Sequence, residues 1–444
     1  MSEPLNRLSD LITAAKRLGA DAADAIFVQG VSVGVSWRMG QLEDVERSEG
    51  HDLGLRVFIG KRQASVSATD LSDRTLGPLP ERAVAMARLA PEDPYCGLAP
   101  AALLARTVPD LDLADPYEPS TEALIALSRT AEEAALGVAG ITNSEGAGAS
   151  WGSSRVTLVT SEGFAQSYAS TSSSFSCSVL AGSGTSMERD YDFDSARFFA
   201  DLGSPQKVGI SAAERALKRL NPRKVATQSV PVVFDPRVSM SLVGHLAGAI
   251  NGAAIARGTS FLKDKMGQQI FARGITVIDD PHRRRGLRSR PFDGEGVGND
   301  RLALIADGVL QTWLLDMASA KQLSLASNGR AARGTSGPPS PSTTNLWMEP
   351  GPVTPRELIR DIGAGFYVTE LIGMGVNGVT GDYSRGAAGF WIENGEIAYP
   401  VSEVTIAGNL KNMFLNLTPA SDLAFKYGTN APTLRIERMT IAGS

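Results

Sequence analysis

The chain has 444 residues, of which 43% are hydrophobic and 20% are charged. This composition excludes a disordered chain, and the length is typical of two or three domains. The formal net charge of −5 excludes a generally basic surface, so nucleic acid is not expected as a partner.

The N-terminal half alternates between helical and strand-like patterns. Apolar residues at helical spacing predict a helix over 5–18, and period-two alternation predicts antiparallel strands across 25–69. A second helix is expected over 72–89. The proline-rich stretch 91–119 is a candidate linker, and it leads to a helix over 120–136, strands over 153–184 and a helix over 204–220.

The C-terminal half begins after a boundary at 222–229. A short apolar strand is expected at 230–234, and an uncharged helix with many small residues follows over 238–256. Later apolar segments predict short strands at 275–278, 302–305, 366–372, 389–392 and 397–401. The stretch 327–350 has little periodicity, and a loop of this length is usually functional or covered by a partner.

These patterns predict an α+β fold. The N-terminal α+β region is expected at 1–225, with mixed or antiparallel sheets, helices, and subdomains at 1–92 and 117–225. A β-rich domain with a small-residue helix near its start is expected at 229–444.

The sequence also carries signals of the cellular compartment. Cys96 and Cys177 lie far apart, which favours free thiols and a reducing compartment. The opening MSEPLNRLSD lacks the basic and apolar segments of a secretory signal. The uncharged run 238–256 approaches a membrane-spanning length, but its small and polar residues favour a helix buried in protein. We therefore expect a cytoplasmic protein without membrane association.

Motifs for metal and nucleophile chemistry are weak in this chain. The three histidines His51, His245 and His282 form no paired zinc pattern, so no metal ligand and no catalytic residue are predicted. Gly148–Gly152 matches G-x-S-x-G around Ser150, but a strand follows it where a nucleophile elbow needs a helix. Ser260 begins an S-x-x-K pattern without its companion motifs.

Three further features favour structural interpretations. The pattern G-x-G-x-x-G at 373–378 precedes another turn-rich stretch and not a helix, which favours tight turns over a nucleotide site. The basic run 282–290 is flanked by carboxylates, as in a solvated or salt-bridged loop. A lone His245 on an apolar helix face is more often a hydrogen-bonded core residue than a ligand.

Several short sequence motifs lie between residues 231 and 443, including Leu246–Gly252, Arg257–Leu262, Pro338–Asn345, Gly373–Gly378 and Thr380–Gly386. Together they resemble the TldD/PmbA metallopeptidase family, in its PmbA (TldE) branch. In this family, TldD-type subunits carry H-E-x-x-x-H on the helix after the first C-terminal strand, where the two histidines hold a metal and the glutamate is the general base. Here those positions correspond to Val243, Gly244 and Gly248, so the resemblance implies a subunit without a metal site.

The resemblance further implies a heterodimer with a TldD-like subunit, which would hold a zinc-type metal. Such a complex cleaves unfolded or extended peptides, matures microcin-type precursors and degrades an antidote protein. The family label "modulator of DNA gyrase" does not require DNA binding. This chain is expected to be inactive without its partner, and the sequence leaves open whether the isolated chain forms a homodimer.

A peptide substrate could bind to the C-terminal loops and edge strands by strand addition. Candidate peptide-binding residues are Asn251, Arg257, Ser260, Asp382, Ser384 and Arg385. The alternative is that these side chains only cap turns and pair with one another. Two other functions stay open: a free-standing hydrolase that uses Ser150 or Ser260, and a homodimeric peptide-binding protein without activity.

Overall fold

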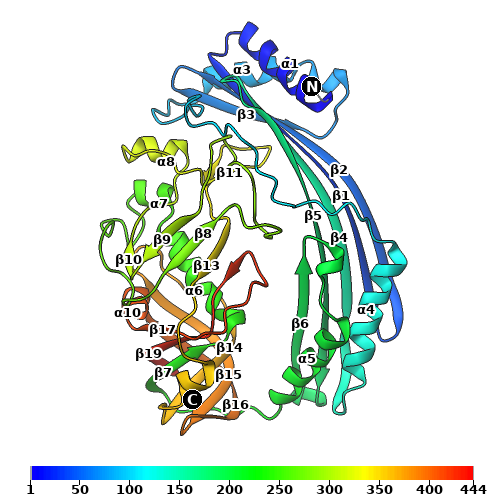
Figure 1. Ribbon diagram of the computed structural model, residues 1–444, viewed down its shortest axis with the longest axis vertical. Coiled ribbons are helices and arrows are strands. Elements are labelled where there is room, and N and C mark those ends of the chain that lie inside the picture. The colour runs from blue at the N-terminus through cyan, green and yellow to red at the C-terminus, as the bar shows by residue number, and fades with distance from the viewer. Residues whose placement is uncertain (1–2, 444) are drawn as a thin grey trace.

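The computed structural model describes residues 3–443. Its N-terminal half is a long curved sheet that arches along one side of the β-rich C-terminal half (Figure 1). This architecture confirms the predicted α+β fold.

One antiparallel sheet runs through the whole N-terminal half, in the order β3-β2-β1-β4-β5-β6. Its strands are β1 (Ala22–Arg38), β2 (Gln41–Ile59), β3 (Arg62–Ala68), β4 (Ile141–Thr160), β5 (Ala165–Ala181) and β6 (Glu188–Ala196). The predicted subdomains 1–92 and 117–225 each give three strands to it, because β1 pairs with β4 along most of its length.

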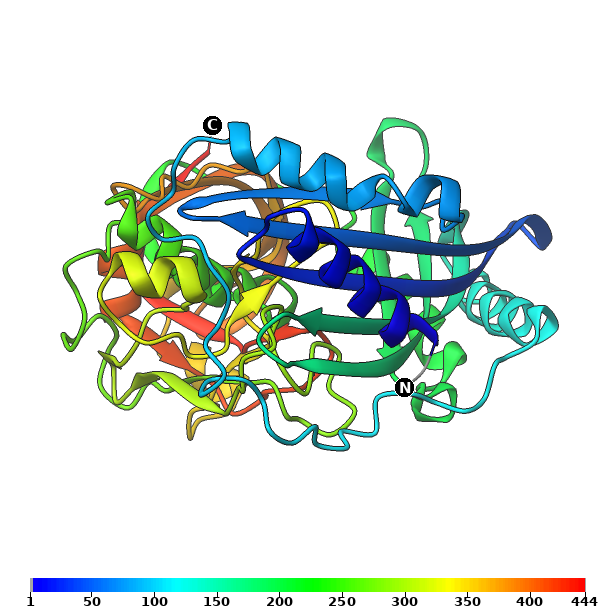
Figure 2. The same cartoon turned by 90° about the horizontal axis from the view of Figure 1, so that it is seen from above.

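Helices cover the outer face of this sheet at both ends. Figure 2 shows α1 (Glu3–Arg17) and α3 (Leu79–Leu89) lying across one end, with the short α2 (Asp73–Leu76) before α3. At the other end, α4 (Thr121–Leu136) and α5 (Pro205–Lys218) pack on alternate apolar residues such as Val33, Ala149 and Phe175. The predicted helix over 72–89 is therefore two helices, interrupted by Gly77 and Pro78.

The inner face of the sheet is built from small residues where α4 and α5 cover the outer face. The residues between the buried apolar positions are mostly serine and glycine, including Ser32, Gly34, Ser150, Ser174 and Ser176. A hollow of about 390 Å³ lies over this surface. Alternation thus gives the sheet one apolar face and one shallow polar face.

A closed barrel forms the base of the C-terminal half. Its order is β16-β15-β14-β7-β19, and β16 also pairs with β19. The strands are β7 (Gln228–Phe234), β14 (Ala364–Ile372), β15 (Asp382–Glu393), β16 (Glu396–Asn409) and β19 (Leu434–Ala442), with β17 (Leu417–Pro419) outside the ring on β19. Closure removes the free edges that strand addition to these five strands would need.

A second sheet lies on the barrel, in the order β10-β9-β8-β13-β18. The strands are β8 (Val277–Asp280), β9 (Leu302–Ala306), β10 (Val309–Leu310), β13 (Asn345–Met348) and β18 (Thr429–Asn430). The remaining elements are the hairpin β11 (Ala331–Ala332) and β12 (Ser340–Pro341), and the helices α8 (Met317–Gln322), α9 (Pro355–Ile359) and α10 (Leu410–Leu415).

The uncharged run 238–256 forms two short helices, α6 (Pro236–Ala249) and α7 (Gly252–Ala256). Asn251 separates them, because its side chain accepts the N–H groups of Ala253 and Ala254 as an N-cap. Leu242 and Leu246 of α6 lie in the C-terminal core. Within residues 3–443, no helix combines the length and apolar character needed to cross a membrane.

The two halves dock through a buried ionic contact. Asp24 of β1 is fully buried, and its carboxylate lies 2.5 Å from Arg56 Nη2 and 2.7 Å from Arg333 Nη1. The approach is close, since a Cβ added to Gly54 would lie 2.1 Å from the Thr335 carbonyl oxygen. The stretch 327–350, predicted as a long loop, thus contacts the N-terminal half of the same chain at Arg333 and Thr335. It also contains three short strands, at 331–332, 340–341 and 345–348.

The proline-rich stretch 91–119 strengthens this docking. It contains no named helix or strand, as a linker should, but Leu104 forms a β-bridge with Val297 and packs beside Phe292. The stretch 91–119 therefore packs against both halves of the protein.

Candidate functional site

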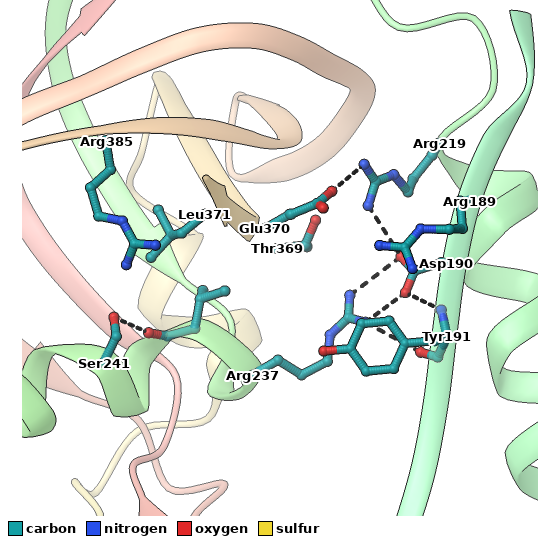
Figure 3. Close-up of a pocket in the computed structure, with 11 residues that line it drawn as sticks. Arg189, Asp190, Tyr191, Arg219, Arg237, Ser241, Thr369, Glu370, Leu371 and Arg385 are labelled. Carbon is teal, nitrogen blue, oxygen red and sulfur yellow. Dashed lines mark hydrogen bonds and ion pairs between the residues drawn. The ribbon is translucent and has the colours of Figure 1, made fainter. Parts of the chain in front are cut away.

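A polar cavity of about 330 Å³ lies between the two halves, away from the Asp24 contact. The N-terminal half contributes β6 and α5, and the C-terminal half contributes α6, β14 and β15 (Figure 3). Its charged lining residues are Arg189, Asp190, Arg219, Arg237, Glu370 and Arg385. Four guanidinium groups thus face two carboxylates.

Ion pairs join the halves across this cavity. Arg219 Nη2 lies 2.5 Å from Glu370 Oε2, and Arg237 Nη1 lies 2.7 Å from Asp190 Oδ1. Burial alone would lower the pKa of Arg219, but the contacts with Glu370 and Asp190 outweigh it and raise the pKa. These arginines are therefore occupied by protein carboxylates.

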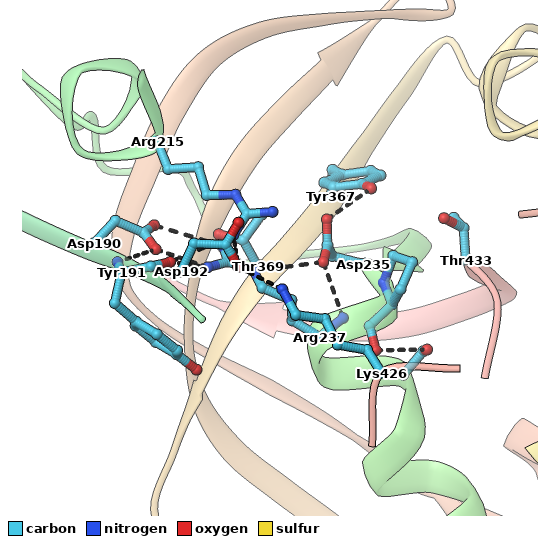
Figure 4. Close-up of polar contacts among 12 residues, drawn as sticks. Asp190, Tyr191, Asp192, Arg215, Asp235, Arg237, Tyr367, Thr369, Lys426 and Thr433 are labelled. Carbon is cyan, nitrogen blue, oxygen red and sulfur yellow. Dashed lines mark hydrogen bonds and ion pairs between the residues drawn. The ribbon is translucent and has the colours of Figure 1, made fainter. Parts of the chain in front are cut away.

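Arg237 and Asp190 also line a second cavity of about 530 Å³. Figure 4 shows the polar contacts of these two residues. The second cavity is lined by aromatic rings, including Tyr367 and Tyr399. Tyr367 donates to Asp235 over 3.1 Å, and burial with the nearby Asp235 charge raises the Tyr367 pKa far above its ordinary value. The phenol therefore stays protonated as a donor.

Three polar atoms beside the first cavity lack hydrogen-bond partners among residues 3–443: Arg385 Nε, His245 Nε2 and Tyr383 Oη. The rings of His245 and Tyr383 meet edge to face at 5.9 Å, and the Arg385 guanidinium lies near the Tyr383 hydroxyl without hydrogen-bonding geometry. Buried polar atoms are normally paired, so the trio is unusual, and Arg385 is its member that lines the cavity.

The protonation states of this trio suit binding. Burial, with the Arg385 charge, lowers the pKa of His245, so its ring is neutral at pH 7. Burial raises the pKa of Tyr383, so its hydroxyl is neutral too. A neutral imidazole, a phenol and a guanidinium can together hydrogen-bond the N–H and C=O groups of a peptide. His245 was expected to be a hydrogen-bonded core residue. This is wrong for its Nε2 atom, which has no hydrogen-bond partner among residues 3–443.

Helix α6 offers no metal ligands at the positions where TldD-type subunits carry them. Val243 is fully buried, whereas Gly244 and Gly248 are exposed and have open space where a side chain would stand. Nowhere in the described chain do three or more His, Cys, Asp or Glu side chains gather as a metal site would require. The side chains at positions 243, 244 and 248 therefore supply no metal ligands.

The six candidate peptide-binding residues have different surroundings in the structure. Arg385 lines the cavity. Ser260 is buried and donates to the Ala249 carbonyl over 2.5 Å, and Asp382 accepts from Thr380 and Asn409. Asn251 caps α7 and donates to Pro341, so it also has a local structural contact.

Arg257 and Ser384 lie on the surface outside the cavity lining. Arg257 ends α7, and the backbone N–H of Ser384 donates to Gly375. The contacts of Asn251, Ser260 and Asp382 match the turn-capping alternative. Of the six candidates, Arg385 lines the cavity between the two halves.

The structure places the remaining sequence motifs in a strand, a loop and a set of ion pairs. Ser150 lies within β4, where its hydroxyl pairs with Ser174 over 2.9 Å, and no strand–turn–helix elbow surrounds it. Residues 373–378 form the loop between β14 and β15, with no helix after it. In the basic run, Arg285 pairs with Asp112 and Asp201, as expected for a salt-bridged loop.

Three comparisons with known proteins relate the chain to one group. Family models described as PmbA/TldA metallopeptidase domain 1, central domain and C-terminal domain match residues 23–89, 114–220 and 227–443. Metalloprotease PmbA of Escherichia coli O157:H7 is 40% identical over 96% of this chain and 93% of its own length.

Two solved structures share the fold over almost the whole chain. A candidate modulator of DNA gyrase from Bacteroides thetaiotaomicron is 26% identical, with a TM-score of 0.91 over 100% of both chains. TldE from Thermococcus kodakarensis is 21% identical, with a TM-score of 0.88 over 98% of this chain and 100% of its own.

Proposed function

The chain belongs to the TldD/PmbA family of metallopeptidases, and on this premise we propose that it is the subunit without metal ligands in a two-subunit peptidase. A TldD-type subunit would supply the metal and the general base. The observation that carries the proposal is the surface of α6, which presents Gly244 and Gly248 where the metal-bearing subunits carry ligands.

The role of this chain is to hold the substrate. The unpartnered groups of His245, Tyr383 and Arg385 are suited to peptide N–H and C=O groups, which every peptide carries whatever its sequence. Such groups suit unfolded or extended peptides, and the resemblance to the family implies microcin-type precursors and an antidote protein among them. Nucleic acid has no part in this function.

The first experiment measures cleavage of an unfolded peptide by this chain, by a TldD-type subunit from the same organism, and by their mixture. Each reaction is run with and without a chelator. We expect cleavage in the mixture only, abolished by chelation. Chelator-resistant cleavage by this chain alone would refute the proposal and indicate a free-standing hydrolase, to be tested with Ser150→Ala and Ser260→Ala. No gain on mixing would indicate a binding protein without activity.

We expect Arg385→Gln to lower kcat/KM of the mixture about tenfold or more, because a charge-assisted hydrogen bond contributes about 1.5–3 kcal/mol. The matched control is Arg356→Gln, which removes an exposed arginine whose partner is the exposed Glu396. A substrate-binding role requires that a peptide bind the Arg385 variant more weakly, as measured by fluorescence anisotropy. Unchanged binding and kcat/KM would remove Arg385 from the site.

A further inference from the structure

One edge of the N-terminal sheet is open over half of a strand. Strand β3 pairs with β2 only over Leu53–Ile59, so β2 has no neighbour on that side from Gln41 to Asp52. Every residue from Gln41 to His51 is exposed. An unpaired strand of this length offers a row of free N–H and C=O groups to another chain.

The opposite edge of the same sheet is blocked by its own side chains. In β6, the carboxylates of Asp190, Asp192 and Asp194 each accept the N–H of the following residue over 2.8–2.9 Å. The Tyr191 carbonyl also accepts from Arg215. On β2, within the part of the chain that the structure describes, no side chain accepts an N–H from residues 42–51. The two edges therefore differ in their readiness to pair.

The open edge is held rigidly in its extended form. At the turn before β2, the N–H groups of Met39 and Gly40 donate to the two oxygens of Glu132 over 2.9 and 3.0 Å. Glu132 is fully buried on α4, which fixes the tip of the hairpin to the body of the protein. On its other side β2 pairs with β1 from Gln41 to Phe58, with a bulge at Glu43. A pre-formed edge loses little conformational entropy on binding.

The charge of the edge selects its partner. Its exposed part carries four carboxylates, of Glu43, Asp44, Glu46 and Glu49, and one arginine. That arginine, Arg47, is already paired with Glu49 and Glu118. Two copies of this chain joined along β2 would place carboxylates near carboxylates, which is destabilising. A basic strand would be attracted.

Apolar contact is available on the same hairpin. Met39, Leu42 and Val45 are large hydrophobic residues that are 42–52% exposed. A partner strand could cover them, which would add burial of apolar surface to the backbone hydrogen bonds.

We propose that the acidic edge Gln41–Asp52 docks an extended basic segment of the metal-bearing subunit, which adds a strand to the N-terminal sheet. The identity of that subunit rests on the proposed function. The open backbone groups supply hydrogen bonds, and the carboxylates exclude a second copy of this chain from the edge.

The test compares two matched charge reversals. Glu43→Lys/Glu46→Lys reverses the edge, and Glu393→Lys/Glu396→Lys reverses two exposed glutamates on the β15–β16 hairpin of the other half. Calorimetric titration with the purified TldD-type subunit measures Kd at low and high salt. We expect the edge variant to bind at least about tenfold more weakly and to lose most of the salt dependence, and the control to match the wild type. Circular dichroism checks that both variants fold.

Hydrogen exchange of the wild-type complex locates the contact. The proposal expects slower exchange of amides within 41–52 on binding. Unprotected amides, or an edge variant that binds like the wild type, would overturn the docking edge and leave the two-subunit function standing. Failure of the wild type to bind the subunit at all would overturn both proposals.

Discussion

We expect Asp24→Asn to lower the free energy of unfolding by about 3–5 kcal/mol, the cost of breaking a buried ion pair from one side. Burial would raise the pKa of Asp24, but Arg333 and Arg56 outweigh it and keep the carboxylate ionised. The asparagine would leave two buried guanidinium groups without a counter-charge. Because Arg333 comes from the C-terminal half and Arg56 from the sheet, the loss also weakens the docking of the halves.

Urea unfolding, followed by circular dichroism, measures this effect. Asp70→Asn is the control, since Asp70 is an exposed carboxyl that accepts hydrogen bonds from its neighbours Ser72 and Thr75. Arg333→Met added to Asp24→Asn should recover part of the loss, because it removes one of the uncompensated charges. A variant within about 1 kcal/mol of the wild type would show that the contact is not ionic in the native state.

The second large effect concerns pH. Burial, together with the charge of Asp293, raises the pKa of Glu295 to about 8. The native state therefore holds a proton that the unfolded state releases above its ordinary pKa near 4.5. Between the unfolded-state and native-state pKa values of Glu295, the free energy of unfolding falls as pH rises. The proton held by the Glu295–Asp293 pair accounts for a fall of about 1.4 kcal/mol per pH unit. Glu295→Gln should remove this contribution.

Urea unfolding at pH 5.5, 6.5 and 7.5 tests the prediction. The stability difference between Glu295→Gln and the wild type should move in favour of the variant by about 2–3 kcal/mol across the range. The glutamine can still accept the N–H of Met317, which lies 2.8 Å from Glu295 Oε2. Glu357→Gln is the control, because helix-capping contacts lower the pKa of Glu357 and it stays ionised throughout. Parallel curves for Glu295→Gln and the wild type would contradict the assignment.

Local patterns predicted the helices and strands because their causes are local. The alternation around Val33 and Val35 places apolar side chains on the face that packs against α4 and α5, and Ser120 caps α4 as its sequence suggests. The pairing of β1 with β4 had no local signal, since it joins residues such as Asp24 and Thr160 that are far apart in the sequence. The closure of the barrel by pairing of β16 with β19 was not predicted, for the same reason.

The candidate site was predicted only in part. Arg385 was selected through the family resemblance, and it lines the cavity. Arg219 and Glu370 were missed, since each is an ordinary surface charge in its own segment and gains a partner only when the halves dock. Ser260 was selected from the same phrases, but its hydroxyl is committed to the backbone of Ala249. A short motif does not distinguish a buried structural hydroxyl from a binding one.

The blocked edge of β6 has a consequence during protein synthesis. About 250 residues follow this strand, and at 5–20 residues per second the ribosome needs roughly 12–50 s to make them. Throughout that interval the N-terminal sheet has no C-terminal half to lie against. The aspartates that accept the backbone N–H groups of β6 belong to the strand itself. These N–H groups are therefore hydrogen-bonded as soon as the strand folds. Nascent chains on neighbouring ribosomes thus meet an edge that is already closed to pairing.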